Sequence, residues 1–132
     1  GTPNIEGAIA LGAACDYLRG ISWPEIIKRE EVLVDYFFKK LEVCDFVRLL
    51  GGKSGRLPLF ALDLQGFHPH DAADLLGEQG IVTRAGHHCA QPLHDALEVS
   101  SSLRASLSFY NTTAEIDIFF RTLRSIKKSF SF

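Results

Sequence analysis

The chain has 132 residues, which is enough to bury one hydrophobic core but too few for two domains. Hydrophobic residues make up 46% and charged residues 23%, and the net charge of −2 provides no basic surface for nucleic acid or for an anionic membrane. No apolar run approaches the ~20 residues that span a bilayer, and the first residues lack the features of a secretion signal. We therefore expect a single soluble domain over residues 1–132.

Three widely spaced cysteines, Cys15, Cys44 and Cys89, form no CxxC pair. Because this pattern does not suggest a disulfide framework, we expect a reducing, cytoplasmic compartment, with import into an organelle left open. Cys15 and Cys44 fall within apolar helical patterns, where a buried and unreactive thiol is the usual outcome. Cys89 has different surroundings.

Apolar residues at helical spacing predict a first helix over residues 4–19, with Gly20 as its end. A second helix is predicted from the S-x-x-E capping box at Ser22 to about Glu42. Its inward residues should be Ile27, Val34, Phe37, Phe38 and Leu41. Residues 46–50 and 57–64 have strand patterns, and the turn-rich segment between them indicates a hairpin.

Farther along, the pattern predicts a short helix from residues 68–71 to near Gly80, a strand over 81–84 and a long loop over 85–102. Alternating apolar and polar residues predict a strand over 103–110 with one buried face. A second capping box, Thr112 with Glu115, starts the last helix. Its buried residues should be Ile116, Phe119, Phe120, Leu123 and Ile126. This order predicts an α+β fold with a small mixed, largely antiparallel sheet of about four strands covered by helices.

Residues 84–93, RAGHHCAQPL, contain the densest group of reactive side chains. A thiol reacts as its thiolate, and nearby cationic groups lower the pKa of a thiol. Arg84, His87 and His88 would provide such a setting for Cys89 if the loop folds them together, and Gly86 permits a tight turn. The pattern predicts a nucleophilic cysteine, the alternative being a free cysteine that merely lies in a loop.

The sequence contains candidates for two other kinds of site, a metal site and a carboxylate-binding site. The donors that zinc takes occur here, but none falls in a recognised zinc spacing, so no intrinsic metal site is predicted. These donors are His68, His70, His87, His88, Cys89 and His94. Arg104, on the polar face of the last strand, is suited to bidentate capture of a substrate carboxylate, although a single arginine is more commonly a surface residue.

The block at residues 84–92 resembles the active-cysteine motif of group II cysteine desulfurases, the SufS-like and selenocysteine-lyase-like branch of the class V aminotransferases. Two further blocks agree in order and spacing: GTPN at 1–4, and LRASL at 103–107 followed by YNT at 110–112. The histidine pair and the absence of a long insertion after Cys89 favour group II over the IscS-like group I. The resemblance covers the whole chain and implies the small domain of a fold type I transferase that depends on pyridoxal phosphate.

The resemblance implies that pyridoxal phosphate activates L-cysteine and that Cys89 takes its sulfur as a persulfide, leaving alanine. Arg104 would hold the substrate carboxylate, and Arg84 would be a second arginine of the active site. Thr2 would reach the cofactor phosphate across a homodimer. The persulfide would feed iron–sulfur cluster assembly through a sulfur-acceptor protein, either SufE-like or zinc-containing and SufU-like.

The resemblance implies more distant roles for three histidines. His87 and His88 would support the groups that touch the substrate. His70, in the sequence HPHD, would take a coordination position on the zinc of the acceptor and free an acceptor thiolate.

The family holds its cofactor with a lysine in a serine-histidine-lysine context, which none of the six lysines of this chain has. The chain therefore resembles the C-terminal small domain of a longer enzyme, without the large domain that carries that lysine, and we expect it to be inactive alone. Two alternatives stay open: a selenocysteine lyase, which shares these residues, and a non-catalytic, stand-alone interaction domain.

Overall fold

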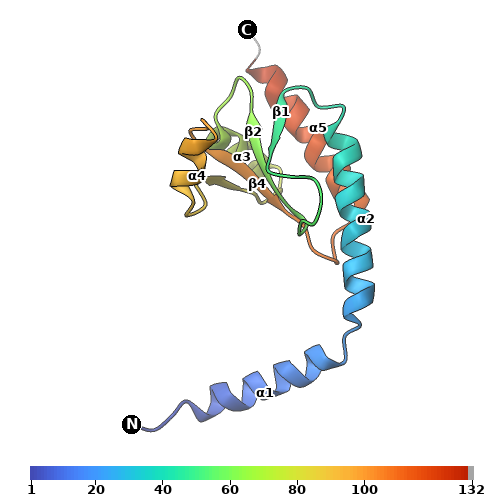
Figure 1. The fold of residues 1–132 in the computed structure, drawn as a ribbon, viewed down its shortest axis with the longest axis vertical. Coiled ribbons are helices and arrows are strands. Elements are labelled where there is room, and N and C mark those ends of the chain that lie inside the picture. The colour runs from blue at the N-terminus through green and yellow to red at the C-terminus, as the bar shows by residue number, and fades with distance from the viewer. Residues whose placement is uncertain (131–132) are drawn as a thin grey trace.

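The computed structural model describes residues 1–130, which form five helices and four strands (Figure 1). The elements in chain order are α1 (Ile5–Arg19), α2 (Trp23–Leu41), β1 (Val47–Leu50), β2 (Leu59–Leu64), α3 (Pro69–Glu78), β3 (Arg84–Gly86), α4 (Gln91–Ala96), β4 (Ser102–Ser106) and α5 (Thr113–Ser129).

The strands form one sheet in the order β1-β2-β4-β3, with every neighbouring pair antiparallel. In its middle, Leu62 of β2 lies opposite Leu49 of β1 on one side and Leu103 of β4 on the other. Side chains from α2, α3 and α5 join those of the sheet in one hydrophobic core. The predicted α+β fold with a four-stranded, largely antiparallel sheet is thus confirmed.

Aromatic rings form the centre of this core. Phe37 of α2 is 1% exposed and stacks on Phe60 of β2, with ring centroids 3.7 Å apart. The ring of Phe120 of α5 also packs on Phe37, with ring centroids 4.8 Å apart. All the residues predicted to be buried on the last helix are buried. The predicted capping box at its start is also present, since Thr112 and Glu115 each accept a hydrogen bond from the other's backbone N–H.

The capping box predicted at Ser22 does not form, because the Ser22 side chain makes no hydrogen bond to the start of α2. Ile27 is 55% exposed rather than inward, since the first turns of α2 extend beyond the sheet, and Leu33 is buried farther along. Three of the other expected residues, Val34, Phe38 and Leu41, are only partly buried at the edge of the core.

The segment between α3 and β4 differs most from expectation. The predicted strand over 81–84 is displaced to Arg84–Gly86, and the expected loop over 85–102 contains both β3 and the helix α4. With six residues, α4 is too short for apolar periodicity to reveal it. The last strand ends at Ser106 because the chain then turns, held by mutual hydrogen bonds between Ser108 and Asn111.

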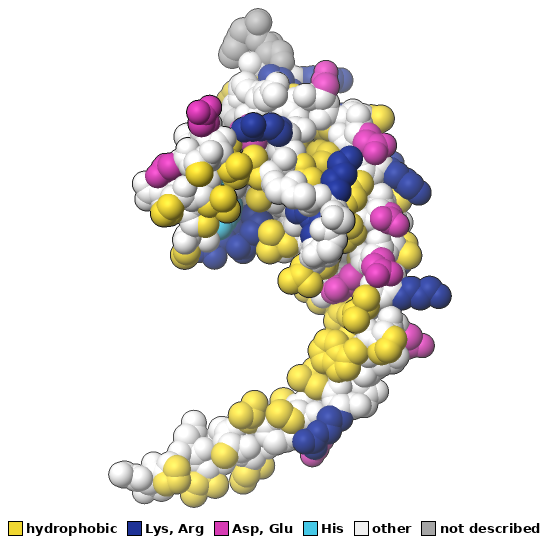
Figure 2. Space-filling view, in the orientation of Figure 1, with side chains coloured by type: hydrophobic (Ala, Val, Ile, Leu, Met, Phe, Trp, Pro, Cys, Tyr) yellow, Lys and Arg dark blue, Asp and Glu magenta, His cyan; other side chains and the backbone are white. Residues whose placement is uncertain are grey.

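Helix α1 extends away from the rest of the molecule and has no buried residue (Figure 1). Its apolar side chains lie on the surface, as Figure 2 shows, and Ile9 is 69% exposed. Cys15 is consequently exposed, which contradicts its predicted burial, whereas Cys44 is buried as predicted. An apolar helical pattern yields burial only where another element packs on it, and no other part of residues 1–130 packs on α1. Among residues 1–130, none of the helices combines the length and the hydrophobicity that a membrane span requires.

Candidate active site around Cys89

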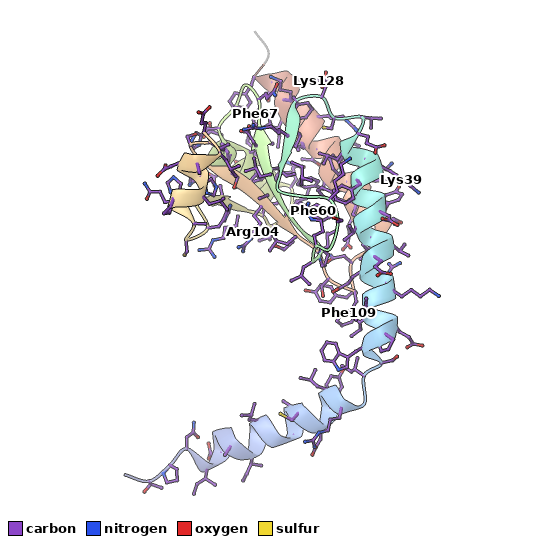
Figure 3. The ribbon with its side chains drawn as sticks, viewed as in Figure 1. Lys39, Phe60, Phe67, Arg104, Phe109 and Lys128 are labelled. Atoms are coloured by element: carbon purple, nitrogen blue, oxygen red, sulfur yellow. The ribbon has the colours of Figure 1, made fainter. Side chains whose placement is uncertain are left out.

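The Cys89 region is built on the pairing of β3 with β4. Arg84 of β3 lies directly opposite Arg104 of β4, so both side chains belong to the same face of the sheet. Leu103 and Ala105, which alternate with Arg104, face the core, so the arginines are on the face away from the core helices. Figure 3 shows Arg104 on the side of the sheet away from α2.

A tight turn follows β3 and presents the cysteine. The backbone N–H of Ala90 donates to the carbonyl oxygen of His87 at 2.9 Å. The two central residues, His88 and Cys89, have φ angles of 53° and 61°. Positive φ at both central positions is characteristic of a type I′ turn, which favours glycine and asparagine. This conformation is disfavoured by about 1–2 kcal/mol for each of the other residues, so the surrounding structure must stabilise it. Cys89 itself is exposed.

His88 anchors one side of this turn. Its Nε2 lies 3.1 Å from the carbonyl oxygen of Ser102 and must donate, since a carbonyl only accepts. Its Nδ1 is buried without a hydrogen-bond partner among the described residues. Burial lowers the pKa of His88, and the hydrogen bond to Ser102 partly opposes this shift. The positive charge of Arg104 adds to the lowering, with smaller effects from His94 and Arg84, so the pKa stays below its ordinary value. The neutral imidazole is therefore favoured in the folded chain.

This pKa shift predicts a pH dependence of stability. The unfolded chain binds a proton at His88 near the ordinary pKa of 6.5, whereas the folded chain does so only at lower pH, so stability should fall as the pH drops below 6.5. His88→Gln retains an N–H donor for Ser102 but does not titrate. Urea unfolding at about pH 7.5 and about pH 5.5 should show a smaller loss of stability in this variant than in the wild type. Equal losses would contradict the assignment.

The other residues predicted for the site lie at increasing distance from Cys89: His87 belongs to its turn, His70 borders the neighbouring strand, and Thr2 is remote. His87 is exposed and meets the ring of His94 edge-on at a centroid distance of 5.5 Å. His70 is exposed at the start of α3, and its Nε2 lies 4.0 Å from the position that a Cβ on Gly86 would occupy. It therefore borders the strand that leads to the Cys89 turn. Residues 1–4, which include Thr2, lie at the free end of α1, far from the sheet (Figure 1).

Arg104 has an unused donor. Its Nε is buried and makes no hydrogen bond within the described residues, and neither Arg104 nor Arg84 is in an ion pair there. A guanidinium with free donors suits a carboxylate, which accepts two parallel N–H bonds. The site thus combines an exposed thiol with two arginines on the neighbouring strands.

The pattern of the class-V aminotransferases matches residues 1–119 of the sequence. The chain belongs to this family. A probable cysteine desulfurase of Halalkalibacterium halodurans is 42% identical over 98% of the chain, and one of Synechocystis sp. is 43% identical over 99%. In each case the match covers 32% of the relative, so the chain spans about a third of the length of these relatives.

Solved structures that resemble this fold are also cysteine desulfurases. The apo cysteine desulfurase of Thermococcus onnurineus NA1 matches 98% of the chain with a TM-score of 0.87 and 33% identity. The cysteine desulfurase CsdA of Escherichia coli, in its S-sulfonic acid form, matches 97% with a TM-score of 0.84 and 32% identity. In both cases the match covers 32% of the solved chain. The expected family and its resemblance to cysteine desulfurases are confirmed.

This class-V aminotransferase chain supplies no amine at the Cys89 site for an imine with pyridoxal phosphate. The lysines lie on α2, between β1 and β2, and on α5: Lys28, Lys39, Lys40, Lys53, Lys127 and Lys128. Segment 81–111, which forms the site, has none. The residues of the site can therefore supply a nucleophilic thiol and donors for a carboxylate. They include no lysine to which the cofactor could be attached. Within residues 1–130, no three His, Cys, Asp or Glu side chains are grouped to hold a metal ion.

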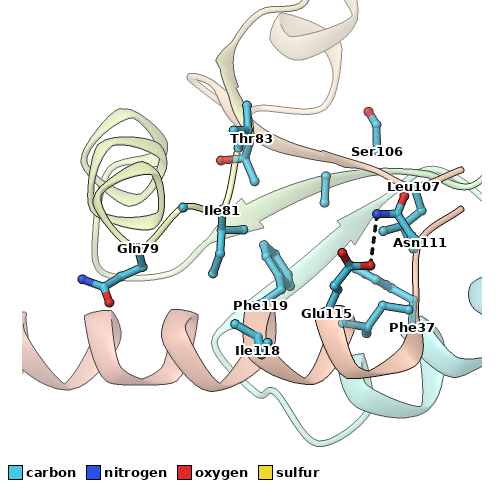
Figure 4. Close-up of a pocket in the computed structure, with 14 residues that line it drawn as sticks. Phe37, Gln79, Ile81, Thr83, Ser106, Leu107, Asn111, Glu115, Ile118 and Phe119 are labelled. Atoms are coloured by element: carbon cyan, nitrogen blue, oxygen red, sulfur yellow. Dashed lines mark hydrogen bonds between the residues drawn. The ribbon is translucent and has the colours of Figure 1, made fainter.

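A separate cavity of about 410 Å³ lies between the end of α3, the end of β4 and the start of α5 (Figure 4). Apolar side chains such as Ile81 and Phe119 line it, and a hydrogen bond from Asn111 to Glu115 crosses one end. Neither Cys89 nor Arg104 borders this cavity.

Two residues of the Cys89 region were not identified as functional from the sequence. The sequence indicates His94 of α4 only as a metal donor and gives no signal for Ser102. Both are buried, at 5% and 0% exposure, and hydrogen-bonded to each other. A polar residue at a buried position is a signal, but the sequence does not show which positions are buried.

Proposed function

We propose that this chain is the sulfur-accepting, C-terminal small domain of a cysteine desulfurase that depends on pyridoxal phosphate, and that Cys89 accepts the sulfur. The observation that carries the proposal is the exposed thiol in a left-handed turn, next to the strand pair that bears Arg84 and Arg104. The names of the relatives support the reaction.

In the proposed step, the Cys89 thiolate attacks the sulfur of L-cysteine. The S–S bond forms as the Cβ–S bond of the substrate breaks, and the electron pair of that bond stays on the substrate carbon, where a proton completes alanine. Sulfur is oxidised to the persulfide level while the carbon is reduced, so no external oxidant is required. Pyridoxal phosphate, held by the longer protein, would supply the electron sink for this chemistry.

The proposal assigns the substrate carboxylate to Arg104. Replacing Arg104 by alanine in the full-length protein should weaken the contact by about 1.5–3 kcal/mol, which raises KM for L-cysteine roughly 10- to 150-fold. Arg48→Ala is the matched control, because Arg48 lies in the same sheet but pairs with Asp63 through an exposed ion pair. Steady-state kinetics would measure both variants, and an unchanged KM for Arg104→Ala would remove it from the binding site.

The rest of the enzyme would cover α1. Exposed apolar residues along this helix, such as Ile5, Ile9 and Leu11, favour burial against another protein surface. We propose that the large domain, which would carry the cofactor lysine, supplies this surface and that the enzyme is a homodimer. Thr2 would then reach the cofactor phosphate of the second subunit.

The persulfide would pass to a sulfur-acceptor protein of iron–sulfur cluster assembly in the cytoplasm. His70 supports contact with a zinc-containing acceptor, because its imidazole is exposed and borders the strand before Cys89. His70→Ala in the full-length protein should reduce the rate with the zinc-containing acceptor but not the rate with dithiothreitol. An unchanged response to the acceptor would eliminate this role.

The function is tested by incubating the full-length protein with L-cysteine and analysing the peptide that contains Cys89 by mass spectrometry. We expect one additional sulfur atom on Cys89 and one alanine for each sulfur transferred. A protein that forms neither product would instead support the stand-alone interaction domain. Faster turnover of selenocysteine than of cysteine would support the selenocysteine lyase.

A further inference from the structure

We propose that His94 and Ser102 form a clamp that holds Cys89 in its left-handed turn, and that His94 is thereby a positioning residue for sulfur transfer. The link to sulfur transfer rests on the proposed function, whereas the clamp rests on hydrogen bonds within this chain.

His94 connects the residue after Cys89 to the sheet. Its Nδ1 lies 3.0 Å from the carbonyl oxygen of Ala90, which only accepts, so Nδ1 carries a proton. In the neutral ring, Nε2 then accepts from the hydroxyl of Ser102, which lies 3.0 Å away. Both ring nitrogens of this buried side chain are therefore satisfied, and its orientation is set from two sides.

Ser102 also holds the residue before Cys89. Its carbonyl oxygen accepts from Nε2 of His88 at 3.1 Å. One buried residue of β4 is thus connected to both neighbours of Cys89, through its carbonyl to His88 and through its hydroxyl and His94 to Ala90. Cys89 lies between these two fixed points.

The backbone of the turn needs such support. His88 and Cys89 both have positive φ and neither is glycine, so the turn would relax if it were free. Residues held in disfavoured conformations persist when the surrounding structure determines them, and they concentrate at functional sites. Buried hydrogen bonds to a central strand provide that constraint here and leave the thiol exposed.

The two contacts of His94 are separable by substitution. His94→Gln carries its amide near the position of Nε2, so it retains a bond to Ser102, which anchors α4 to the sheet. His94→Asn carries its amide near the position of Nδ1, so it retains only the contact to Ala90, which lies within the same turn of chain. His94→Leu removes both contacts, and Ser102→Ala removes the anchor from the other side. Asp95→Asn, at an exposed neighbouring position, is the control.

The first measurement uses the 132-residue chain and NMR. A positive φ places the amide proton close to the Hα of the same residue, so Cys89 should show a strong intraresidue NOE in the wild type, in Asp95→Asn and in His94→Gln. The NOE should weaken in His94→Leu, His94→Asn and Ser102→Ala. An NOE of wild-type strength in His94→Asn and Ser102→Ala overturns the clamp, and these two variants decide the matter if His94→Leu does not fold.

The second measurement uses the full-length protein and L-cysteine. Displacement of the nucleophile should lower kcat about 10- to 100-fold in His94→Asn, with KM within about twofold of the wild type, and His94→Gln should recover most of kcat. An unchanged kcat in a variant that has lost the NOE overturns the positioning role. A wild-type protein without desulfurase activity overturns the proposed function together with that role, while the NOE comparison still decides the clamp.

Discussion

Replacement of Cys89 by serine in the full-length protein should abolish sulfur transfer, with a loss of kcat on the order of a thousandfold or more. Serine preserves the size of the side chain and its exposed position in the turn, but a hydroxyl is far less ionised and less nucleophilic than a thiol near neutral pH. Binding of L-cysteine should survive, because Arg104 and its free donor are unchanged. Alanine release and persulfide mass on the Cys89 peptide would measure the effect.

Cys15→Ser is the control for this substitution, because it makes the same chemical change at a cysteine that lies on α1, away from the paired strands. Its activity should equal that of the wild type. Cys44 is unsuitable as a control because it is buried in the core, where burial raises the pKa of its thiol. Persulfide formed in Cys89→Ser, or activity lost in Cys15→Ser, would contradict the assignment of the nucleophile.

Phe37→Ala should lower the free energy of unfolding of the chain by about 3–5 kcal/mol. The side chain is almost fully buried and contacts aromatic rings from β2 and α5, so its removal leaves a cavity and abolishes the stacking on Phe60. Because small domains are stable by only about 5–15 kcal/mol, this single change should bring the chain close to unfolding. Urea denaturation would measure the difference.

Val32→Ala provides the comparison on the same helix, because Val32 is 48% exposed. Its stability should remain within about 0.5 kcal/mol of the wild type. Phe37→Leu should fall between the two, since leucine fills part of the volume but loses the stacking on Phe60. A loss below about 1 kcal/mol in Phe37→Ala would mean that the core does not depend on this ring.

Where local signals are strong, the sequence alone was sufficient to predict the elements of the fold and the family. The last helix was predicted with its capping box and its complete buried face, because helical periodicity and the Thr112–Glu115 pair are both encoded within a few turns. The hairpin of β1 and β2 was predicted for the same reason, since the apolar runs and the intervening turn residues are adjacent in the chain. The family was predicted from contiguous blocks of residues.

Local patterns were misleading where burial depends on distant parts of the chain. The sequence places Cys15 and Cys44 in similar apolar helical patterns, yet Cys15 is exposed on α1 and Cys44 is buried just beyond the end of α2. The difference is that the core packs on the segment around Cys44, whereas no described element packs on α1. Likewise, Ser22 and Thr112 begin the same capping-box pattern, but only Thr112 forms it.

The sequence by itself therefore determined the fold class and the family, and it predicted Cys89, Arg84 and Arg104 as candidate site residues. Only the tertiary structure decided how the segments that carry them are arranged. Strand register places Arg84 opposite Arg104, and α4 brings His94 onto Ser102. These relations depend on antiparallel pairing and on helix packing between segments many residues apart, and neither is encoded in the periodicity of a single segment.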